Sequence, residues 1–270
     1  MIAGWPLEQP DPPRAVRERA AGRTVHCVWE NQLGGLTFRI EDADGVPVEY
    51  VKWAPAGSGL DLAKEAGRLR WAAARTTVPR VVDLLGDDDG STCLITAPIA
   101  GDSAVAPMWL AQPERAVTAI GRGLRQLHDV LDPADCPFSW SVEDRLRDVR
   151  RLVADGTRAE PSGWNEDHQH LALDDVLDVL ASPPPVDRLV VCHGDACAPN
   201  TLVAPDGSVA GHVDLGSLGV ADRWADLAIA TWSTGWNYGP GWEDVLLDAY
   251  GIASDPDRTR YYRLLWDLGP

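Results

Sequence analysis

The chain has 270 residues, 45% of them hydrophobic and 24% charged, which is enough to bury one large core or two smaller ones. Its net charge of −17 argues against a nucleic-acid partner, because phosphate binding needs a basic patch. That acidity suits the attraction of a polycationic small molecule, but solubility is the simpler explanation. No stretch approaches the roughly 18 apolar residues of a membrane span. The start lacks the pattern of a secretory signal, and five cysteines without paired CxxC motifs favour a reducing cytoplasm.

The first third of the sequence has the pattern of a small, mostly antiparallel β-sheet. Strands are predicted over residues 24–30, 36–42, 46–54, 78–86 and 91–101. The sequence NQLGG between the first two strands suits a hairpin, because it supplies two glycines. One helix is predicted over residues 60–75, where Leu62, Ala66, Leu69 and Ala73 recur at helical spacing.

After the Pro- and Gly-containing stretch APIAGDSAVAP, the predicted elements are mostly helices. Helices are predicted over residues 113–131, 141–156, 171–182, 223–232, 242–251 and 257–269, and short strands within 187–195 and 200–217. This order predicts an α+β, bilobal protein-kinase-like fold: a small antiparallel sheet with one helix in an N-lobe of residues 1–97, and a larger, mostly helical C-lobe of residues 98–270. The order alone is weak support for function.

A polar motif, HGDACAPN, follows the apolar run of a predicted core strand. Asn200 lies five residues after Asp195, and Asp214 lies on the next predicted hairpin. Kinases that transfer the γ-phosphoryl group of ATP use one Asp to orient the attacking hydroxyl, and an Asn and a second Asp to hold Mg²⁺. The HGD triplet alone is equally well explained by a turn in which the Asp caps backbone amides. The three residues together favour phosphoryl transfer.

The first third supplies a matching pair of charges. Lys52 ends the third predicted strand, where a kinase Lys reaches the α- and β-phosphates, and Glu65 lies in the following helix, where it can pair with that Lys. Each residue alone is better explained as an ordinary surface charge. Because the sequence has no Walker A motif, a P-loop enzyme is disfavoured.

The segments VVCHGDACAPN, GHVDLGSLGVADRWADLA, DAYGI and YYRLLWDL resemble the aminoglycoside phosphotransferase family, in particular its 3'-phosphotransferase (kanamycin kinase) branch and the streptomycin-phosphorylating relatives. The resemblance runs from about residue 30 to the C-terminus. It implies that Asp195 is the catalytic Asp and that Asn200 and Asp214 are Mg²⁺ ligands. It also implies that Lys52 binds the phosphates of ATP and that Glu65 holds Lys52 in place.

The same resemblance implies further contacts with the nucleotide. Tyr50 falls where family members stack an aromatic ring on adenine, although a cross-strand core aromatic is the alternative. Ala97 and Ile99 fall at connector positions whose backbone groups bond the adenine edge. The turn that contains Asn31 and Gly34 is expected to lie over the phosphates, on position alone, because it is not a strict GxGxxG motif.

His193 precedes the catalytic Asp and is interpreted as a residue that orients the loop through hydrogen bonds. A metal site formed by His193 with Cys192 and Cys197 is disfavoured, because structural zinc usually has more closely spaced cysteines and four ligands.

The resemblance also implies a set of carboxylates that bind the ammonium groups of the antibiotic. The predicted insert GWNEDHQH supplies Glu166 and Asp167, and the tail supplies Asp267 and the terminal carboxylate of Pro270. Ammonium groups that lose water in a cleft need charged partners. Solvated surface acids are an equally good explanation of each residue taken singly.

Two positions depart from the pattern of the 3'-enzymes. Ala198 stands three residues after the catalytic Asp, where many members carry an acid, and Ser217 stands at the Arg of the D-x-G-R motif. The APN sequence and the tail lean slightly towards the streptomycin-phosphorylating relatives. The two departures put kanamycin turnover in doubt, but not phosphoryl transfer itself.

The sequence therefore predicts an ATP- and Mg²⁺-dependent phosphotransferase that acts on an aminoglycoside hydroxyl, most often the 3'-OH of kanamycin- or neomycin-type compounds, and confers resistance. The alternatives are a streptomycin 3''-phosphotransferase, a kinase for another small hydroxyl compound, and a non-catalytic nucleotide- or antibiotic-binding protein. We expect a cytoplasmic monomer or homodimer without nucleic-acid or membrane partners.

Overall fold

A computed structural model describes residues 4–154 and 161–269. The chain divides into two compact units, residues 1–100 and 101–270, where the sequence suggested a boundary after residue 97. The first unit contains an antiparallel sheet and the second is largely helical, so the α+β class predicted from the sequence is confirmed.

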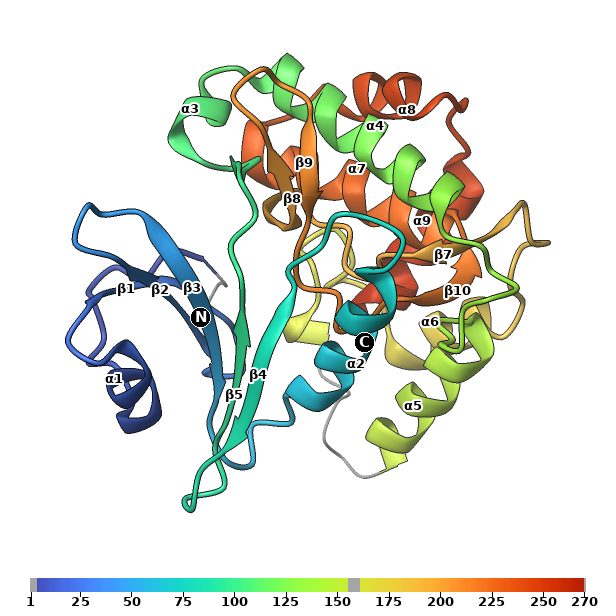
Figure 1. Ribbon diagram of the computed structural model, residues 1–270. Helices are drawn as coiled ribbons and strands as arrows, with labels where there is room; N and C mark the ends of the chain where they lie inside the picture. Colours follow the sequence, from blue (N-terminus) through green and yellow to red (C-terminus); the bar gives the residue numbers. More distant parts are fainter. Residues whose placement is uncertain (1–3, 155–160, 270) are drawn as a thin grey trace. The chain divides into compact units, whose positions relative to one another are not determined.

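The sheet of the first unit has five strands in the order β1-β2-β3-β5-β4, all antiparallel. The strands are β1 (Thr24–Glu30), β2 (Leu36–Glu41), β3 (Pro47–Ala54), β4 (Val81–Gly86) and β5 (Thr92–Thr96). Helix α2 (Leu62–Ala72) connects β3 to β4 (Figure 1). Its N-cap residue is Asp61, whose side chain accepts a hydrogen bond from the backbone N–H of Lys64.

A second helix in this unit, α1 (Arg14–Ala20), adds to the single helix expected from the sequence. It has only seven residues, and only Val16 and Ala20 are buried, so its apolar periodicity is too short to stand out. Both residues pack against Phe38, Ile40 and the rest of the inner face of the sheet.

The segment before α1 runs along the edge strand β1. The backbone of Gly4 exchanges two hydrogen bonds with Glu30, each 2.9 Å long. The side-chain amide of Gln9 binds the backbone of Cys27 in the same way: its Oε1 accepts from the N–H at 2.8 Å, and its Nε2 donates to the carbonyl at 3.1 Å.

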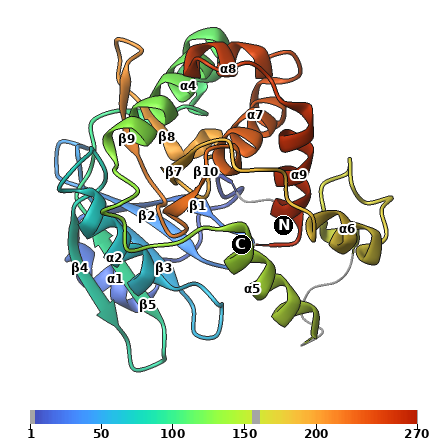
Figure 2. The same ribbon diagram turned by 90° about the vertical axis from the view of Figure 1, so that its right-hand side faces the viewer.

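The second unit is built around packed helices with one large core cluster. Its helices are α3 (Pro107–Leu110), α4 (Pro113–Val130), α5 (Val142–Ala154), α6 (Leu173–Leu180), α7 (Trp224–Tyr238), α8 (Glu243–Tyr250) and α9 (Pro256–Asp267). Helix α4 packs against α8, and α7 against α9 (Figures 1 and 2). In the described part of the chain, none of the helices has the length and apolar character needed to cross a membrane.

Two small antiparallel sheets set the loops of this unit. Strand β7 (Leu189–Cys192) pairs with β10 (Gly219–Asp222), and β8 (Thr201–Val203) lies between β6 (Asp102–Ser103) and β9 (Val209–His212). The chain between β7 and β8 is the HGDACAPN segment, so that motif connects the two sheets.

Candidate active site

The HGD turn begins where the buried strand β7 ends. Gly194 has a φ of +82°, a left-handed conformation that favours glycine. A Cβ atom at this position would lie 2.2 Å from the backbone oxygen of Ser217. The turn thus needs glycine for both conformation and space, and it directs the next residue, Asp195, away from the strand.

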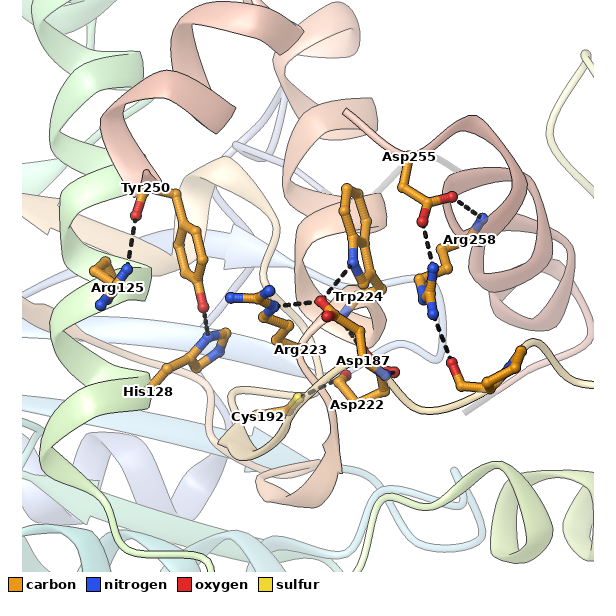
Figure 3. A network of polar contacts seen from close by, with 11 residues as sticks. Arg125, His128, Asp187, Cys192, Asp222, Arg223, Trp224, Tyr250, Asp255 and Arg258 are labelled. Carbon is orange, nitrogen blue, oxygen red and sulfur yellow. Dashed lines mark hydrogen bonds and ion pairs between the residues drawn. The ribbon is translucent and has the colours of Figure 1, made fainter. Parts of the chain in front are cut away.

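A fully buried carboxylate, that of Asp226 on α7, holds this turn from behind. Its Oδ2 accepts the backbone N–H of His193 at 2.6 Å, and its Oδ1 accepts that of Gly194 at 2.9 Å. The ring of His128 binds Oδ2 of Asp226 through Nε2 at 2.9 Å. Its Nδ1 lies 2.9 Å from the hydroxyl of Tyr250 (Figure 3). Burial opposes ionisation of Asp226, but His128, His193 and the Gly194 amide outweigh it and lower the pKa of Asp226.

His193 links the turn to the strand segment that leads to Asp214. Its Nδ1 accepts the backbone N–H of Asp195 at 3.2 Å, so Nε2 carries the ring proton and donates to the carbonyl of Val213 at 2.9 Å. Both ring nitrogens are therefore engaged within the loop, which agrees with an orienting role rather than that of a second base.

Asp195 lies on a partly exposed part of the loop, but its Oδ1 is buried and has no hydrogen-bond partner in the structure. Burial, followed by the neighbouring charge of Asp214, raises the pKa of Asp195. A carboxylate oxygen left without a partner is costly unless a substrate group satisfies it. The structure thus leaves at Asp195 an oxygen able to accept a hydrogen bond from a hydroxyl.

Asn200 and Asp214 flank the same end of the β8–β9 hairpin. Asn200 directly precedes β8, and its carbonyl accepts the N–H of Val213 at 3.0 Å. The Nδ2 of Asn200 donates to the backbone carbonyl of Asp195 at 2.9 Å. Asp214 has a φ of +62°, which is uncommon for a residue with a side chain. The hairpin thus brings the two predicted metal ligands to the loop that carries Asp195.

These residues fit a divalent cation such as Mg²⁺. The amide nitrogen of Asn200 is used within the loop, which leaves the amide oxygen as its ligand atom. The carboxylates of Asp195 and Asp214 are close enough for the charge of one to raise the pKa of the other. Two adjacent negative charges and an amide oxygen form a hard-oxygen donor set of the kind that Mg²⁺ prefers.

In the first unit, the structure brings Lys52 and Glu65 together. The Nζ of Lys52 lies 3.0 Å from Oε1 and 2.8 Å from Oε2 of Glu65. Alternation along β3 explains the contact: Val51 packs in the core on the side of α1, and the adjacent Lys52 points to the opposite face, where α2 presents Glu65. The Lys52 ammonium is therefore held in one place.

The predicted nucleotide contacts lie at separate points of the same unit. Tyr50 lies on β3 between Arg39 of β2 and Thr96 of β5. The N–H of Ala97 donates to the carbonyl of Arg80 at 2.9 Å, so the carbonyl of Ala97 is the group left to bind an adenine edge. Ile99 follows two residues later and is partly exposed.

Asn31 shapes the turn between β1 and β2. Its Oδ1 accepts the N–H groups of Leu33 at 2.9 Å and Gly35 at 2.8 Å, and its carbonyl accepts that of Gly34 at 3.2 Å. The Asn31 side chain therefore fixes the turn, and any nucleotide contact there falls mainly to the backbone.

The acids predicted to bind substrate differ in exposure. Glu166 and Asp167 are exposed, and Oδ2 of Asp167 accepts a hydrogen bond from the indole N–H of Trp232 on α7 at 3.3 Å. Pro270 lies outside the described residues. Glu166 and Asp167 thus remain suited to an ammonium ligand.

Asp267 instead makes internal contacts. Its Oδ1 accepts the N–H of Asn165 at 3.0 Å, and its Oδ2 binds Nδ1 of His168. Burial raises the pKa of Asp267, and His168 partly offsets that effect. Asp267 therefore holds the segment that carries Glu166 and Asp167, and both of its oxygens already have partners.

Sequence reasoning assigned no role to two residues that hold the catalytic loop. One is Asp226, and the other is Ser233, whose Oγ accepts the N–H of Ala198 at 2.9 Å. A signal for Asp226 was available, because a carboxylate within the apolar run RWADLAIATW is rarely buried without partners. Ser233 gave no such signal, because a Ser in a helix usually has only local contacts.

A cluster of His128, Cys192 and Asp226 has the composition of a metal site and is fully buried. Its groups are already engaged: both nitrogens of His128 have partners, and the Cys192 thiol donates to the carbonyl of Asp222 at 3.4 Å (Figure 3). Burial also raises the pKa of Cys192 well above its usual range, which disfavours the thiolate that a metal needs. The cluster is part of the support of the loop.

The site and the fold agree with the comparisons to known proteins. A profile of the phosphotransferase enzyme family matches residues 28–262, so the chain belongs to this family. An aminoglycoside 3'-phosphotransferase of Streptomyces fradiae is 33% identical over 258 residues, which cover 89% of this chain and 93% of that protein.

Two solved structures have the same fold over nearly the whole chain. The crystal structure of an aminoglycoside-3'-phosphotransferase of type VIII has a TM-score of 0.80 at 31% identity, covering 94% of this chain and 97% of that one. An aminoglycoside phosphotransferase of Streptomyces rimosus, in complex with ADP and streptomycin, has a TM-score of 0.73 at 30% identity, covering 94% and 95%. The family resemblance and the kinase-like fold predicted from the sequence are confirmed.

Proposed function

We propose that this protein is an ATP-dependent O-phosphotransferase that phosphorylates a hydroxyl of an aminoglycoside antibiotic and thereby confers resistance. The observation that carries the proposal is the buried, unpartnered Oδ1 of Asp195, on a loop held by Asp226 and beside Asn200 and Asp214. The relatives named above, with aminoglycosides and ADP among their ligands, give the substrate class.

Asp195 accepts the hydrogen bond of the acceptor hydroxyl and aligns its oxygen with the γ-phosphorus of ATP. Burial and the charge of Asp214 raise the pKa of Asp195, which makes its carboxylate a better proton acceptor. The hydroxyl proton passes to Oδ1 as the new P–O bond forms and the bond to ADP breaks. Because the loop is fixed by buried hydrogen bonds, the carboxylate needs little rearrangement, and catalysis is mostly positioning.

The remaining polar residues of the proposed site are assigned to the binding of ATP and Mg²⁺. We assign the nucleotide phosphates to Lys52, which Glu65 holds in place, in a nucleotide-binding first unit that also carries Tyr50, Ala97, Ile99 and the turn at Asn31 and Gly34. Asn200 and Asp214 would hold Mg²⁺, which when bound supplies positive charge that neutralises the phosphate oxygens. The five free cysteines fit action in the reducing cytoplasm.

Two hydroxyl groups are candidates for the position of phosphorylation: the 3'-OH of kanamycin- or neomycin-type compounds, and the 3''-OH of streptomycin. The first is favoured by the 3'-phosphotransferase relatives. The second is favoured by Ala198, which supplies no acid beside the acceptor, and by the streptomycin complex of the S. rimosus enzyme.

The test is an ATP-consumption assay with kanamycin-, neomycin- and streptomycin-type acceptors, followed by NMR of the product to locate the phosphate. We expect turnover with at least one class. In the Asp195→Ala variant, kcat should fall by roughly 10²- to 10⁴-fold while ATP still binds. Asp206→Ala, at an exposed turn between β8 and β9, serves as the matched control and should retain activity.

The other readings have distinct outcomes in the same assay. Turnover of a sugar or amino alcohol but of no aminoglycoside would identify a kinase with another acceptor. ATP binding without turnover of any acceptor would identify a non-catalytic nucleotide-binding protein. Full activity of Asp195→Ala would overturn the role of Asp195.

A further inference from the structure

Two tryptophans on α7 form an aromatic pair of unequal exposure. Trp232 and Trp236 are four residues apart and therefore lie on the same helix face, with ring centroids 5.1 Å apart and an interplanar angle of 44°. Trp232 is only 5% exposed, whereas Trp236 is 47% exposed. A half-exposed indole in contact with a buried one leaves an aromatic surface open to a ligand.

The helix that carries this pair also holds the HGDACAPN loop. Ser233, adjacent to Trp232, accepts the backbone N–H of Ala198, three residues after Asp195. Because a helix rises about 1.5 Å per residue, Trp236 lies less than one turn, roughly 4.5 Å along the axis, beyond Ser233. Trp236 thus lies close along α7 to the side chain that holds the loop of Asp195.

The two rings of the pair differ in whether a cationic side chain of the protein lies over them. The guanidinium of Arg263 already lies over the Trp232 ring, 5.3 Å from its centroid, and is itself bound by Glu243. That ring thus has a cation supplied by the protein, whereas the Trp236 ring has none among the described residues.

The acidic segment is joined to the same tryptophans. Asp167 binds the indole N–H of Trp232, and the ring of His168 lies 5.3 Å from the Trp232 ring. Asp267 in turn holds His168 and the backbone of Asn165. The carboxylate of Asp167 is thereby fixed beside Trp232.

We propose that Trp236, supported by Trp232, whose indole N–H binds Asp167, is a specificity-determining residue that stacks on a cationic amino-sugar or aminocyclitol ring of the acceptor. This inference rests on the proposed function and deepens it. The indole face attracts ammonium groups and packs against the C–H face of a sugar ring, and the carboxylate pairs with an amino group.

The test compares steady-state kinetics of the wild type with Trp236→Ala, using an aminoglycoside that the wild type phosphorylates. Loss of an exposed or partly desolvated cation–π contact should raise the KM for the acceptor by roughly 2- to 30-fold. The KM for ATP should not change. Trp236→Phe, which keeps an aromatic face, should restore most of the affinity. Trp5→Ala, at a position 54% exposed in the first unit, is the matched control and should leave both KM values unchanged.

A second variant keeps the inference testable if Trp236→Ala does not fold. Trp236→Lys places a cation at the surface of the helix and should raise the acceptor KM further, by an amount that shrinks as salt is added. An acceptor KM within about twofold of the wild type for both variants would overturn the inference. No turnover of any aminoglycoside by the wild type would instead contradict the proposed function, so the two failures are distinguishable.

Discussion

The catalytic loop and the acidic segment at residues 165–168 are held in different ways. The loop is fixed through its backbone: the amides of His193, Gly194 and Ala198 bind the side chains of Asp226 and Ser233, which are buried in α7. The acidic segment is fixed mainly through side chains of α7 and α9, at a partly exposed surface.

The difference separates the reaction from the choice of substrate. Backbone contacts to buried partners define the position of Asp195 whatever the neighbouring side chains are, so the chemistry is insulated from surface changes. Side-chain contacts at an exposed segment can be exchanged one at a time without disturbing the core. We therefore expect substitutions in the first region to affect stability and kcat together, and substitutions in the second to affect the acceptor KM.

The largest effect should come from Asp226→Ala. It removes the acceptor of two buried N–H groups and the partner of His128, so the free energy of unfolding should fall by about 3–5 kcal/mol. Because Asp195 loses its fixed position, kcat should fall as well.

The matched control for this change is Asp222→Ala. Asp222 also accepts two backbone N–H groups, that of Asp187 at 2.6 Å in a partly buried bond and that of Trp224 at 2.9 Å in a buried one, but none from the HGD turn. The Asp222→Ala substitution should lower the free energy of unfolding in a denaturant titration, with a much smaller loss of kcat. Equal losses of kcat in the two variants would contradict the positioning role of Asp226.

An intermediate loss of stability is expected at acid pH because of His212, a buried histidine whose ring contacts that of His193. Burial, and then the charge of His193, lowers the pKa of His212 to about 3, and the two rings are in edge contact at 5.7 Å. His128 also opposes protonation of His212, whereas Asp226 and a backbone contact at Gly123 favour it. The unfolded chain, with a His pKa of about 6.5, then binds a proton that the folded protein excludes.

The direction in which stability changes with pH follows from this difference in proton binding. Because the unfolded state binds more protons between pH 6.5 and about 3, stability falls as the pH is lowered through that range, by up to about 1.4 kcal/mol per pH unit from this group. His212→Gln should flatten the acid side of a plot of unfolding free energy against pH. An unchanged slope would show that other groups determine the acid sensitivity.

The smallest effect should come from Asp267→Asn. The new amide oxygen can still accept the N–H of Asn165, but the charge that binds His168 is lost. The free energy of unfolding should change by about 1 kcal/mol or less, and the acceptor KM should rise modestly while kcat stays near that of the wild type. Asp257→Asn, at an exposed position in the first turn of α9, provides the control. A large loss of stability would place Asp267 in the same class as Asp226.

The sequence predicted the elements and the chemistry better than the contacts that hold them. The spacing of Asp195, Asn200 and Asp214 predicted that they lie together, and a loop and hairpin of fixed length do bring them together. Lys52 and Glu65 followed from strand alternation and helix position in the same way. Patterns of this kind involve residues that are close together in the sequence, so they can be recognised without the tertiary structure.

The roles of Asp226 and Asp267 could not be predicted in the same way. Asp226 binds residues more than 30 positions away, and Asp267 binds a segment about 100 positions away. No local pattern encodes a partner at that separation, because it depends on how helices α7 and α9 pack. Asp267, predicted as a substrate-binding acid, therefore makes internal contacts that the sequence did not indicate, whereas Asp167 is exposed.

The amide of Gln9 has a consequence for the behaviour of the protein at high concentration. By imitating a peptide group beside Cys27, and with Gly4 bound to Glu30, it occupies hydrogen-bonding groups along the outer side of β1. An open strand edge is a template on which a second molecule can add its own strand, the first step towards β-aggregation. The N-terminal segment thus covers part of the edge of β1 and hinders self-association there. Its removal would expose these backbone groups.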